Sequence, residues 1–223
     1  MDWARQCAAV IPCFNESVRI AEVVCGVSRF LPKVIVVDDG SADATAETAR
    51  AAGAEVLHHS KNLGKGGALR TGFRHAREQG FIWALMLDGD GQHAPEDIPA
   101  FFACADRTGA ALVTGDRMGH PTAMPWLRRQ VNRRMTRRLS RLTGVSLADS
   151  QCGFRLVSLE AWSGVTLNTH RFEVESEMLV AFIAAGHRVE SVPIGVIYDA
   201  SRSKINPLVD TWRWFRWRLT RRR

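Results

Sequence analysis

Short apolar runs alternate with segments of helical spacing in the first half of this chain, and this alternation limits the fold more than any other feature. The runs predict strands at residues 7–12, 33–37, 54–58, 81–87 and 110–114. Helices are predicted between them at residues 17–30, 42–52 and 95–106, with one more ending near residue 79. Continuous apolar strands separated by helices are typical of a mostly parallel sheet covered on both faces. The sequence therefore predicts a Rossmann-like α/β fold.

The second half of the chain is less regular. Its pattern predicts helices at residues 123–142, 172–185 and 206–219, a strand at 188–193 and a loop at 149–155. At 223 residues the chain is long enough for one sizeable α/β domain. We therefore expect one domain over residues 1–205, followed by a basic and aromatic amphipathic helix over residues 206–223.

Polar residues stand where four of the apolar segments end. They are Asn15-Glu16, Asp38-Asp39, Lys61-Asn62 and Asp88-Gly89-Asp90. In open α/β sheets, ligands bind outside the carboxyl ends of the strands. Four separate segments at one edge predict a binding site there.

Asp88-Gly89-Asp90 is the central motif of that edge. The two carboxylates can point to the same side because side chains alternate in extended chain, and Gly89 permits a close approach by a ligand. Such a pair suits a hard divalent cation that takes its other ligands from water and substrate phosphates. Gln92 or His93 would complete the shell. The alternative is a solvated loop without a ligand.

Two further acids, Asp38 and Asp39, end a buried strand. Unpaired buried carboxylates are costly, so we expect them to be paired or to bind the hydroxyls or base edge of a ligand. The alternative is helix capping by Asp39, Ser41 or Asp43. The loop at residues 62–67 lacks the spacing of a Walker A motif and does not follow the first strand as a Rossmann fingerprint would. Its glycines still allow close backbone approach, with Lys65 near the start of a helix.

Charge is unevenly distributed along the chain. Residues 117–143 carry eight Arg and no acid, and residues 202–223 carry seven Arg and one Lys against one Asp. Since the total is +7, the rest of the chain is acidic. Two basic patches on an acidic body predict a localised anionic partner. The five scattered cysteines, without a CxxC or zinc spacing, indicate small apolar residues in a reducing compartment.

Four motifs together resemble those of family 2 glycosyltransferases, especially dolichol-phosphate mannosyltransferases and polyprenyl-phosphate glycosyltransferases. They are Pro12-Cys13-Phe14-Asn15-Glu16, Asp38-Asp39-Gly40-Ser41, Asn62-Leu63-Gly64-Lys65-Gly66-Gly67-Ala68 and Asp88-Gly89-Asp90-Gly91-Gln92-His93. Residues 115–117, 149–155, 172–175 and 202–204 extend the resemblance to nearly the whole chain.

The resemblance implies a GT-A fold and an inverting, metal-dependent transfer of a sugar from a UDP-glucose or GDP-mannose type donor. It implies a nucleotide-sugar site with Pro12, Asn15, Glu16, Asp39, Lys65 and Asp88, and Mg²⁺ or Mn²⁺ bound through Asp88, Asp90 and Gln92. Phosphates of donor or acceptor would be held by Arg117, Arg128 or Arg133, Arg202 and Lys204. The acceptor would be membrane-associated, with polyprenyl phosphate favoured over a hydroxyl of another lipid or small molecule.

A catalytic base is needed only for some acceptors. A lipid phosphate is already ionised, whereas a hydroxyl needs a carboxylate, for which Asp149 is the candidate with Glu175 behind it. The alternative for Asp149 is a loop cap or an ion pair with Arg155. The sequence also has Asp116 where relatives have Ser, a charge that would weaken anion binding or pair with Arg117.

No apolar stretch approaches the about 18–20 residues that span a bilayer, and the N-terminus lacks a signal-peptide layout. We therefore expect a cytoplasmic protein, peripheral on the inner face of the membrane. The Trp and Arg residues after 206 suit a membrane interface. Rival hypotheses are a nucleic-acid-binding module, a catalytically inactive GT-A scaffold and a nucleotidyltransferase, but no nucleic-acid partner is expected.

Overall fold

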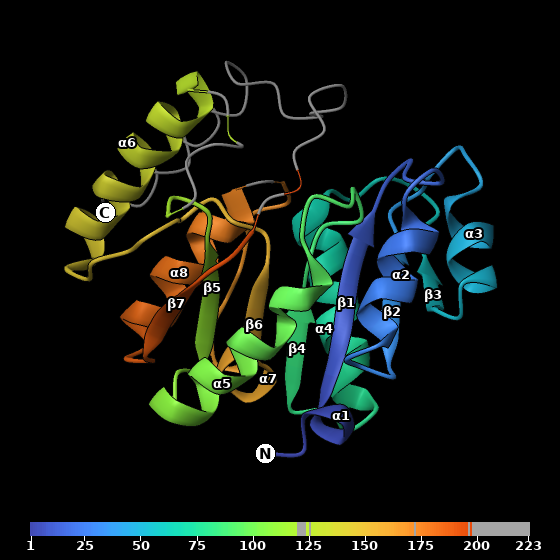
Figure 1. The fold of residues 1–223 in the computed structure, drawn as a ribbon, viewed down its shortest axis with the longest axis horizontal. Helices are drawn as coiled ribbons and strands as arrows, with labels where there is room; N and C mark the ends of the chain where they lie inside the picture. The colour runs from blue at the N-terminus through green and yellow to red at the C-terminus, as the bar shows by residue number, and fades with distance from the viewer. Residues whose placement is uncertain (120–123, 125, 172, 196, 198–223) are drawn as a thin grey trace.

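The computed structural model describes residues 1–119, 124, 126–171, 173–195 and 197 (Figure 1). The predicted helix at 206–219, and with it Arg202 and Lys204, lies outside the described residues. Within them, no helix is both long enough and apolar enough to cross a membrane.

Seven strands form one sheet in the order β3-β2-β1-β4-β6-β5-β7. Their bounds are β1 (Cys7–Cys13), β2 (Val34–Asp38), β3 (Glu55–His58), β4 (Trp83–Met86), β5 (Leu112–Asp116), β6 (Arg155–Ser158) and β7 (Val189–Pro193). β6 runs antiparallel between β4 and β5, whereas β3, β2, β1 and β4 pair in parallel, as do β5 and β7. The predicted mostly parallel sheet is confirmed. β6 itself was not predicted, because the segment before it was expected to be a loop.

Helices connect the strands close to where they were predicted. Their bounds are α1 (Trp3–Gln6), α2 (Ile20–Ser28), α3 (Thr45–Ala51), α4 (Lys65–Glu78), a 3₁₀ turn (Pro95–Asp97), α5 (Ile98–Thr108), α6 (Trp126–Thr143), α7 (Leu159–Ser163) and α8 (Glu173–Ala184). The short helices α1 and α7 were not predicted. Helices shorter than two turns carry too little periodicity to be found from sequence.

The central strand β1 contributes to two separate cores, which explains why its sequence is apolar without interruption. Ile11 packs on one side of the sheet with side chains of α2 and α5, including Phe101. Val10 packs on the other side with α4 and α8, including Phe73. Both phenylalanines are completely buried, and each such burial stabilises the fold by about 1.5–3 kcal/mol. The expectation of helices on both faces is confirmed.

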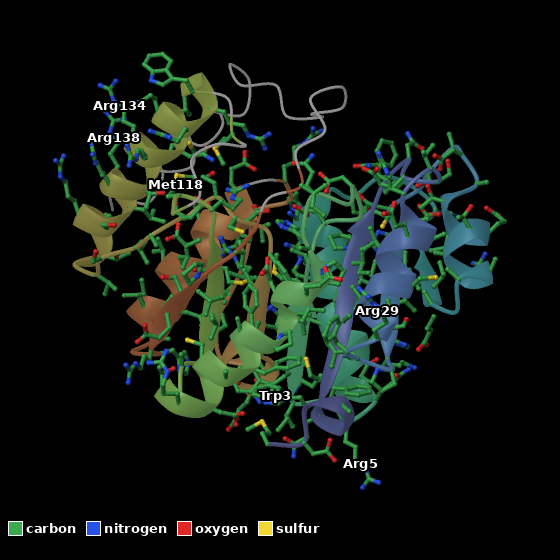
Figure 2. All side chains as sticks on the ribbon, viewed as in Figure 1. Trp3, Arg5, Arg29, Met118, Arg134 and Arg138 are labelled. Carbon is green, nitrogen blue, oxygen red and sulfur yellow. The ribbon has the colours of Figure 1, made fainter. Side chains whose placement is uncertain are left out.

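The carboxyl ends of the parallel strands meet at one edge of the sheet, the upper edge in Figure 1. α6 packs on α8 beside this edge, and Arg134 and Arg138 lie on its outer side (Figure 2). The predicted polar motifs follow β1, β2, β3 and β4, so the topology brings them to the same edge.

Candidate functional site

The loop after β1 is fastened to the loop after β2. The backbone N–H of Asn15 donates to Ser41 Oγ (2.9 Å), and Asn15 Oδ1 accepts from the N–H of Ala42 (2.9 Å). The N–H of Glu16 donates to Thr45 Oγ1 (2.8 Å). Among the residues that the structure describes, Asn15 is the one non-glycine residue with a positive φ (55°). Asparagine tolerates this conformation better than most residues. Pro12 lies within β1, in register with Val37 of β2.

Asp39 organises the next loop at this edge. Its Oδ1 accepts from the N–H of Leu63 (2.9 Å) and lies 2.7 Å from His59 Nδ1, and its Oδ2 accepts from the N–H of Gly64 (2.7 Å). The Asp39 carboxylate is therefore hydrogen-bonded, as we expected from the free-energy cost of burying an unpaired carboxylate. The backbone N–H of Asp39 donates to Cys13 O (2.8 Å), which places it next to the loop of Asn15.

The capping alternative is wrong for all three residues considered, because the N-cap of α3 is Ala44 and that of α4 is Gly64, neither with a side-chain capping bond. Asp43 Oδ1 accepts from the N–H of Thr45, the first residue of α3 (3.1 Å). Ser41 bonds Asn15 instead, and Asp39 bonds the loop that leads to α4. The acids after β2 thus connect loops of the sheet edge.

Lys65, Asp88 and Glu175 form an ionic cluster in which Lys65 and Glu175 are buried and Asp88 is partly exposed. Lys65 Nζ contacts Asp88 Oδ1 and lies 2.6 Å from Glu175 Oε1. The side chains of Lys65 and Glu175 are 9% and 4% exposed. Burial opposes the charged forms of Lys65 and Asp88, but the attraction between opposite charges outweighs it. This attraction raises the pKa of Lys65 and holds the pKa of Asp88 well below its usual range.

Asp90 lies in a different electrostatic environment from Asp88. Burial, followed by the charge of Asp88, raises the pKa of Asp90. Asp90 Oδ1 accepts from the N–H of Gln92 (3.1 Å). His93 is buried, with Nε2 3.6 Å from Asp88 Oδ2 and its ring 5.1 Å from that of Phe154.

The two acids fit a divalent cation that relies on its substrate for further ligands. Burial and the neighbouring Asp88 charge both oppose ionisation of Asp90 and raise its pKa, and a Mg²⁺ or Mn²⁺ ion would favour its ionised form. Among the residues that the structure describes, no three His, Cys, Asp or Glu side chains gather to hold a metal. Two carboxylates are the kind of partial ligand set that Mg²⁺ completes with water and phosphate oxygens.

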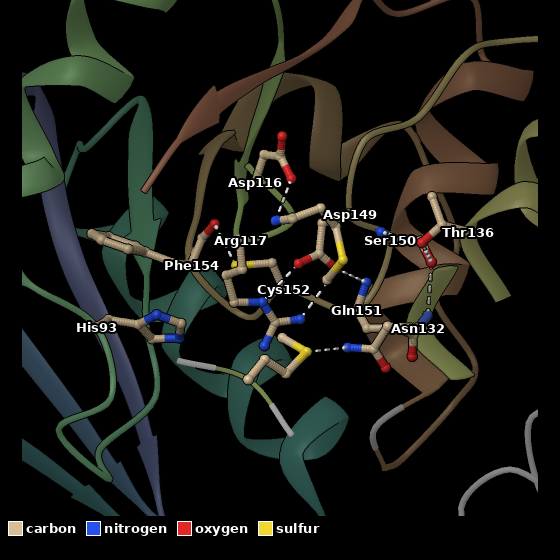
Figure 3. A network of polar contacts seen from close by, with 12 residues as sticks. His93, Asp116, Arg117, Asn132, Thr136, Asp149, Ser150, Gln151, Cys152 and Phe154 are labelled. Atoms are coloured by element: carbon tan, nitrogen blue, oxygen red, sulfur yellow. Dashed lines mark hydrogen bonds and ion pairs between the residues drawn. The ribbon is translucent and has the colours of Figure 1, made fainter. Parts of the chain in front are cut away.

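Arg117 and Asp149 form a second buried pair. Arg117 Nε donates to Asp149 Oδ2 (2.7 Å) and Nη2 donates to Oδ1 (3.1 Å), as Figure 3 shows. Burial opposes ionisation of Asp149, but the guanidinium more than compensates and lowers its pKa. Of the alternatives for Asp149, the loop cap is confirmed, because Oδ1 also accepts from the N–H of Gln151 (3.0 Å), and the ion pair with Arg155 is wrong. Asp116 does not need Arg117 as a partner, because its Oδ1 accepts from the N–H of Met118 (2.8 Å).

Arg155 instead binds three backbone carbonyls. Its guanidinium donates to the O atoms of Ser150 (3.1 Å), Cys152 (2.8 Å) and Glu175 (2.6 Å). Arg155 is completely buried at the start of β6, so it joins the loop before β6 to the first turn of α8. The spacing of residues in sequence could not distinguish this role from an ion pair.

The basic helix α6 is attached to the same loop through its polar inner face. Thr136 Oγ1 accepts from the N–H of Ser150 (3.1 Å) and lies 3.0 Å from its Oγ. Of the two candidate phosphate ligands on α6, Arg133 is exposed and Arg128 is half-buried.

Two partners in the site escaped the sequence analysis. One is His59, which lies between Asp39 and Thr71 Oγ1 (3.0 Å from Nε2). The adjacent pairs His58-His59 and Asp38-Asp39 at the ends of predicted strands were the available signal. The other is the ion pair of Glu175 with Lys65, for which the sequence carries no signal, because 110 positions separate the two residues in the numbering.

Residues 8–163 match the family model described as "Glycosyl transferase family 2". Among the relatives is a UDP-N-acetylglucosamine–dolichyl-phosphate N-acetylglucosaminyltransferase of Methanococcus voltae, 30% identical, with 85% of this chain and 84% of the relative covered. Another is an undecaprenyl-phosphate mannosyltransferase of Micrococcus luteus, 30% identical, with coverages of 83% and 81%.

A solved structure with the same architecture is glucosyl-3-phosphoglycerate synthase from Mycobacterium tuberculosis, in complex with Mn²⁺, UDP and glucosyl-3-phosphoglycerate. Its TM-score is 0.76 at 21% identity, over 97% of this chain and 79% of that one. The likeness confirms the expected GT-A fold.

Proposed function

The chain belongs to glycosyl transferase family 2, and from this premise we propose that it moves a sugar from a nucleotide-sugar to a polyprenyl phosphate. It is a glycosyltransferase; the donor and the acceptor are the proposal. The names of its relatives support a lipid phosphate, since they act on dolichyl or undecaprenyl phosphate.

The observation that carries the proposal is the state of the two candidate bases. Both oxygens of Asp149 accept from Arg117, and the lowered pKa of Asp149 makes it a weak proton acceptor. Glu175 binds the ammonium of Lys65. A hydroxyl acceptor needs a carboxylate that can take its proton, whereas a phosphate monoester arrives with an ionised oxygen. A site whose two candidate bases are each paired with a buried cation therefore favours a phosphate acceptor.

We assign the nucleotide-sugar to the edge formed by the loops after β1, β2 and β4, with Pro12, Asn15, Glu16, Asp39 and Asp88. Lys65 would act there through Asp88, which its ammonium contacts. Mg²⁺ or Mn²⁺ would be held by Asp88, Asp90 and Gln92. The Mycobacterium tuberculosis enzyme, which has been solved with UDP and either Mn²⁺ or Mg²⁺, supports this choice of cofactor. The ion would supply stabilisation of the charge that develops on the departing diphosphate.

In the proposed reaction a phosphate oxygen of the acceptor forms the new bond to the anomeric carbon. The bond from that carbon to the donor diphosphate breaks, and the nucleoside diphosphate leaves with the electron pair. A single displacement inverts the configuration. Asp149 orients Arg117 by accepting from its Nε and Nη2. We propose that the Nη1 group of Arg117, which is not used in this ion pair, contacts a phosphate. Arg128, Arg133, Arg202 and Lys204 would hold the acceptor, and the membrane surface would be approached by the side of the protein on which α6 lies.

The test compares two acceptors that differ only in the phosphate. Purified protein with Mn²⁺ is given UDP-glucose or GDP-mannose together with a short polyprenyl phosphate or the matching polyprenol. We expect release of nucleoside diphosphate with the phosphate acceptor, little with the alcohol, and none with Asp90→Ala. Transfer to the alcohol at an equal rate would refute the acceptor assignment. Absence of release and of donor binding would refute the donor assignment as well.

A further inference from the structure

We propose that Lys65 is a positioning residue that fixes the Asp88 carboxylate beside the metal site, and that Glu175 is the counter-ion that keeps Lys65 there. The inference rests on the proposed function, because it concerns how the same site is built. It assigns Glu175 to the support of a cation instead of to a base.

The backbone around Lys65 is held from two directions. The N–H of Gly64 donates to Asp39 Oδ2 (2.7 Å), and the N–H of Gly66 donates to His170 O (2.9 Å). Gly64 has a φ of +81°, and a Cβ there would lie 2.1 Å from His170 O. Lys65 therefore enters the site from a backbone that has little freedom to shift, as a positioning residue requires.

The Lys65 ammonium is enclosed between acids from two other elements. It contacts Asp88, which follows β4, and lies 2.6 Å from Oε1 of Glu175 on α8. The loop before β6 closes over the contact. A Cβ on Gly153 would lie 2.5 Å from Asp88 Oδ2 and 2.8 Å from Lys65 Nζ. A group so enclosed is screened little by salt, so each charge strongly affects the others.

This arrangement makes the two acids of the Asp88-Gly89-Asp90 motif unequal. Asp88 has an internal cation, whereas Asp90 bonds a backbone N–H. An incoming divalent cation would find Asp88 already oriented and Asp90 without a cationic partner among the ion pairs of the described residues. Glu175 weakens the attraction between Lys65 and Asp88, because the ammonium interacts with both carboxylates.

Removing the negative charge of Glu175 should therefore weaken metal binding, because the Lys65 ammonium then interacts more strongly with Asp88. In Glu175→Gln the ammonium keeps its contact with Asp88 and competes there with the metal. Lys65→Met/Glu175→Gln removes the competitor and restores the net charge of the cluster. A purely structural role for Glu175 would not be rescued by loss of Lys65.

Glu177 provides the matched control. It lies two positions along the same helix, is 1% exposed, and accepts from the N–H groups of Asn168 (3.0 Å) and Thr169 (2.8 Å). Glu177→Gln thus disturbs a buried carboxylate of α8 that does not contact Lys65 in any ion pair of the described residues. Thermal unfolding of every variant reports whether it is folded.

The experiment measures binding of Mn²⁺ with UDP, or with GDP if that is what the wild-type protein binds, by titration calorimetry. We expect Glu175→Gln to lose about 10- to 100-fold in affinity, the usual effect of changing a residue that supports a metal ligand. The double variant should regain most of that affinity but not the wild-type kcat, because Asp88 is no longer held. Glu177→Gln should bind as the wild type does.

Two results would overturn the inference while leaving the proposed function intact. One is equal affinity of Glu175→Gln and Glu177→Gln, and the other is a double variant that binds no better than Glu175→Gln. If the wild-type protein binds neither nucleotide with Mn²⁺, the proposed function fails and the inference fails with it.

Discussion

Arg117 holds both carboxylate oxygens of Asp149, through Nε at 2.7 Å and Nη2 at 3.1 Å, and the two side chains are 9% and 0% exposed. One residue follows β5 and the other lies in the loop before β6, so the pair joins two parts of the sheet edge. In this geometry Asp149, a candidate base, orients the guanidinium of Arg117.

Asp149→Asn should destabilise the protein strongly, because it leaves the buried Arg117 without its counter-charge. Removal of one partner from a buried ion pair costs about 3–5 kcal/mol. Chemical denaturation should show a loss near this range. Asp116→Asn is the control, since Asp116 accepts one hydrogen bond from the backbone of Met118, and its loss should cost about 1 kcal/mol. Equal effects of the two changes would contradict the importance of the pair.

Mn²⁺ together with the donor's nucleoside diphosphate should raise the melting temperature of the wild-type protein. A ligand at 100 times its Kd stabilises a folded protein by about 2.7 kcal/mol. Asp90→Asn should abolish the metal-dependent part of this shift in a thermal melt. Asp106→Asn, a change on the remote surface near Trp3, should leave the shift unaltered. A full shift in the Asp90 variant would remove Asp90 from the proposed metal site.

Gly64→Ala should be much more harmful than Gly80→Ala, although both glycines have a positive φ. Gly80 has φ of +88° and open space around it, so its substitution tests backbone strain alone, about 1–2 kcal/mol. At Gly64 the new methyl group would also meet His170 O at 2.1 Å, which requires the start of α4 to move. Denaturation measurements should separate the two variants, and donor affinity should fall only for Gly64→Ala. Variants of equal stability would contradict the tight contact.

Glu55 should make part of the stability dependent on acid pH. Burial opposes its ionisation, but hydrogen bonds from Lys33, Gln79 and His75 outweigh burial and lower its pKa to about 2. Because its pKa is lower in the folded state than in the unfolded chain, its contribution is present above pH 4.5, the usual pKa of a glutamate, and is lost as the pH falls toward 2. The side chain is one-third exposed, so the contribution should be below about 1 kcal/mol.

The contribution of Glu55 can be measured by comparing the unfolding free energy of Glu55→Gln with that of the wild type at several pH values. The difference in unfolding free energy between the variant and the wild type should be present at pH 6 and shrink steadily between pH 4.5 and pH 2. A difference that stays constant through this range would show that the carboxylate charge of Glu55 does not stabilise the fold.

Much of the fold and part of the site followed from local patterns. The run at residues 7–12 is apolar without interruption, which predicts burial on both faces, and β1 indeed contributes to two cores. The positions of Asp39, Asn62 and Asp88 at strand ends predicted that they share one edge, because parallel strands all point their carboxyl ends the same way. These inferences depend on the period of side chains within one element, which sequence records directly.

The partners of the charged side chains were decided by the tertiary structure. β6 inserts antiparallel between β4 and β5, and this placement sets Asp149 against Arg117 and leaves Arg155 to bind carbonyls. Likewise α8 brings Glu175 to Lys65. Each of these contacts joins residues from elements that lie far apart in the chain, and every acid in the site could meet several bases. The sequence by itself determined which residues reach the edge of the sheet. The packing of β6 and α8 decided which charges pair there, because burial makes the free energy of a charge depend on its immediate neighbours.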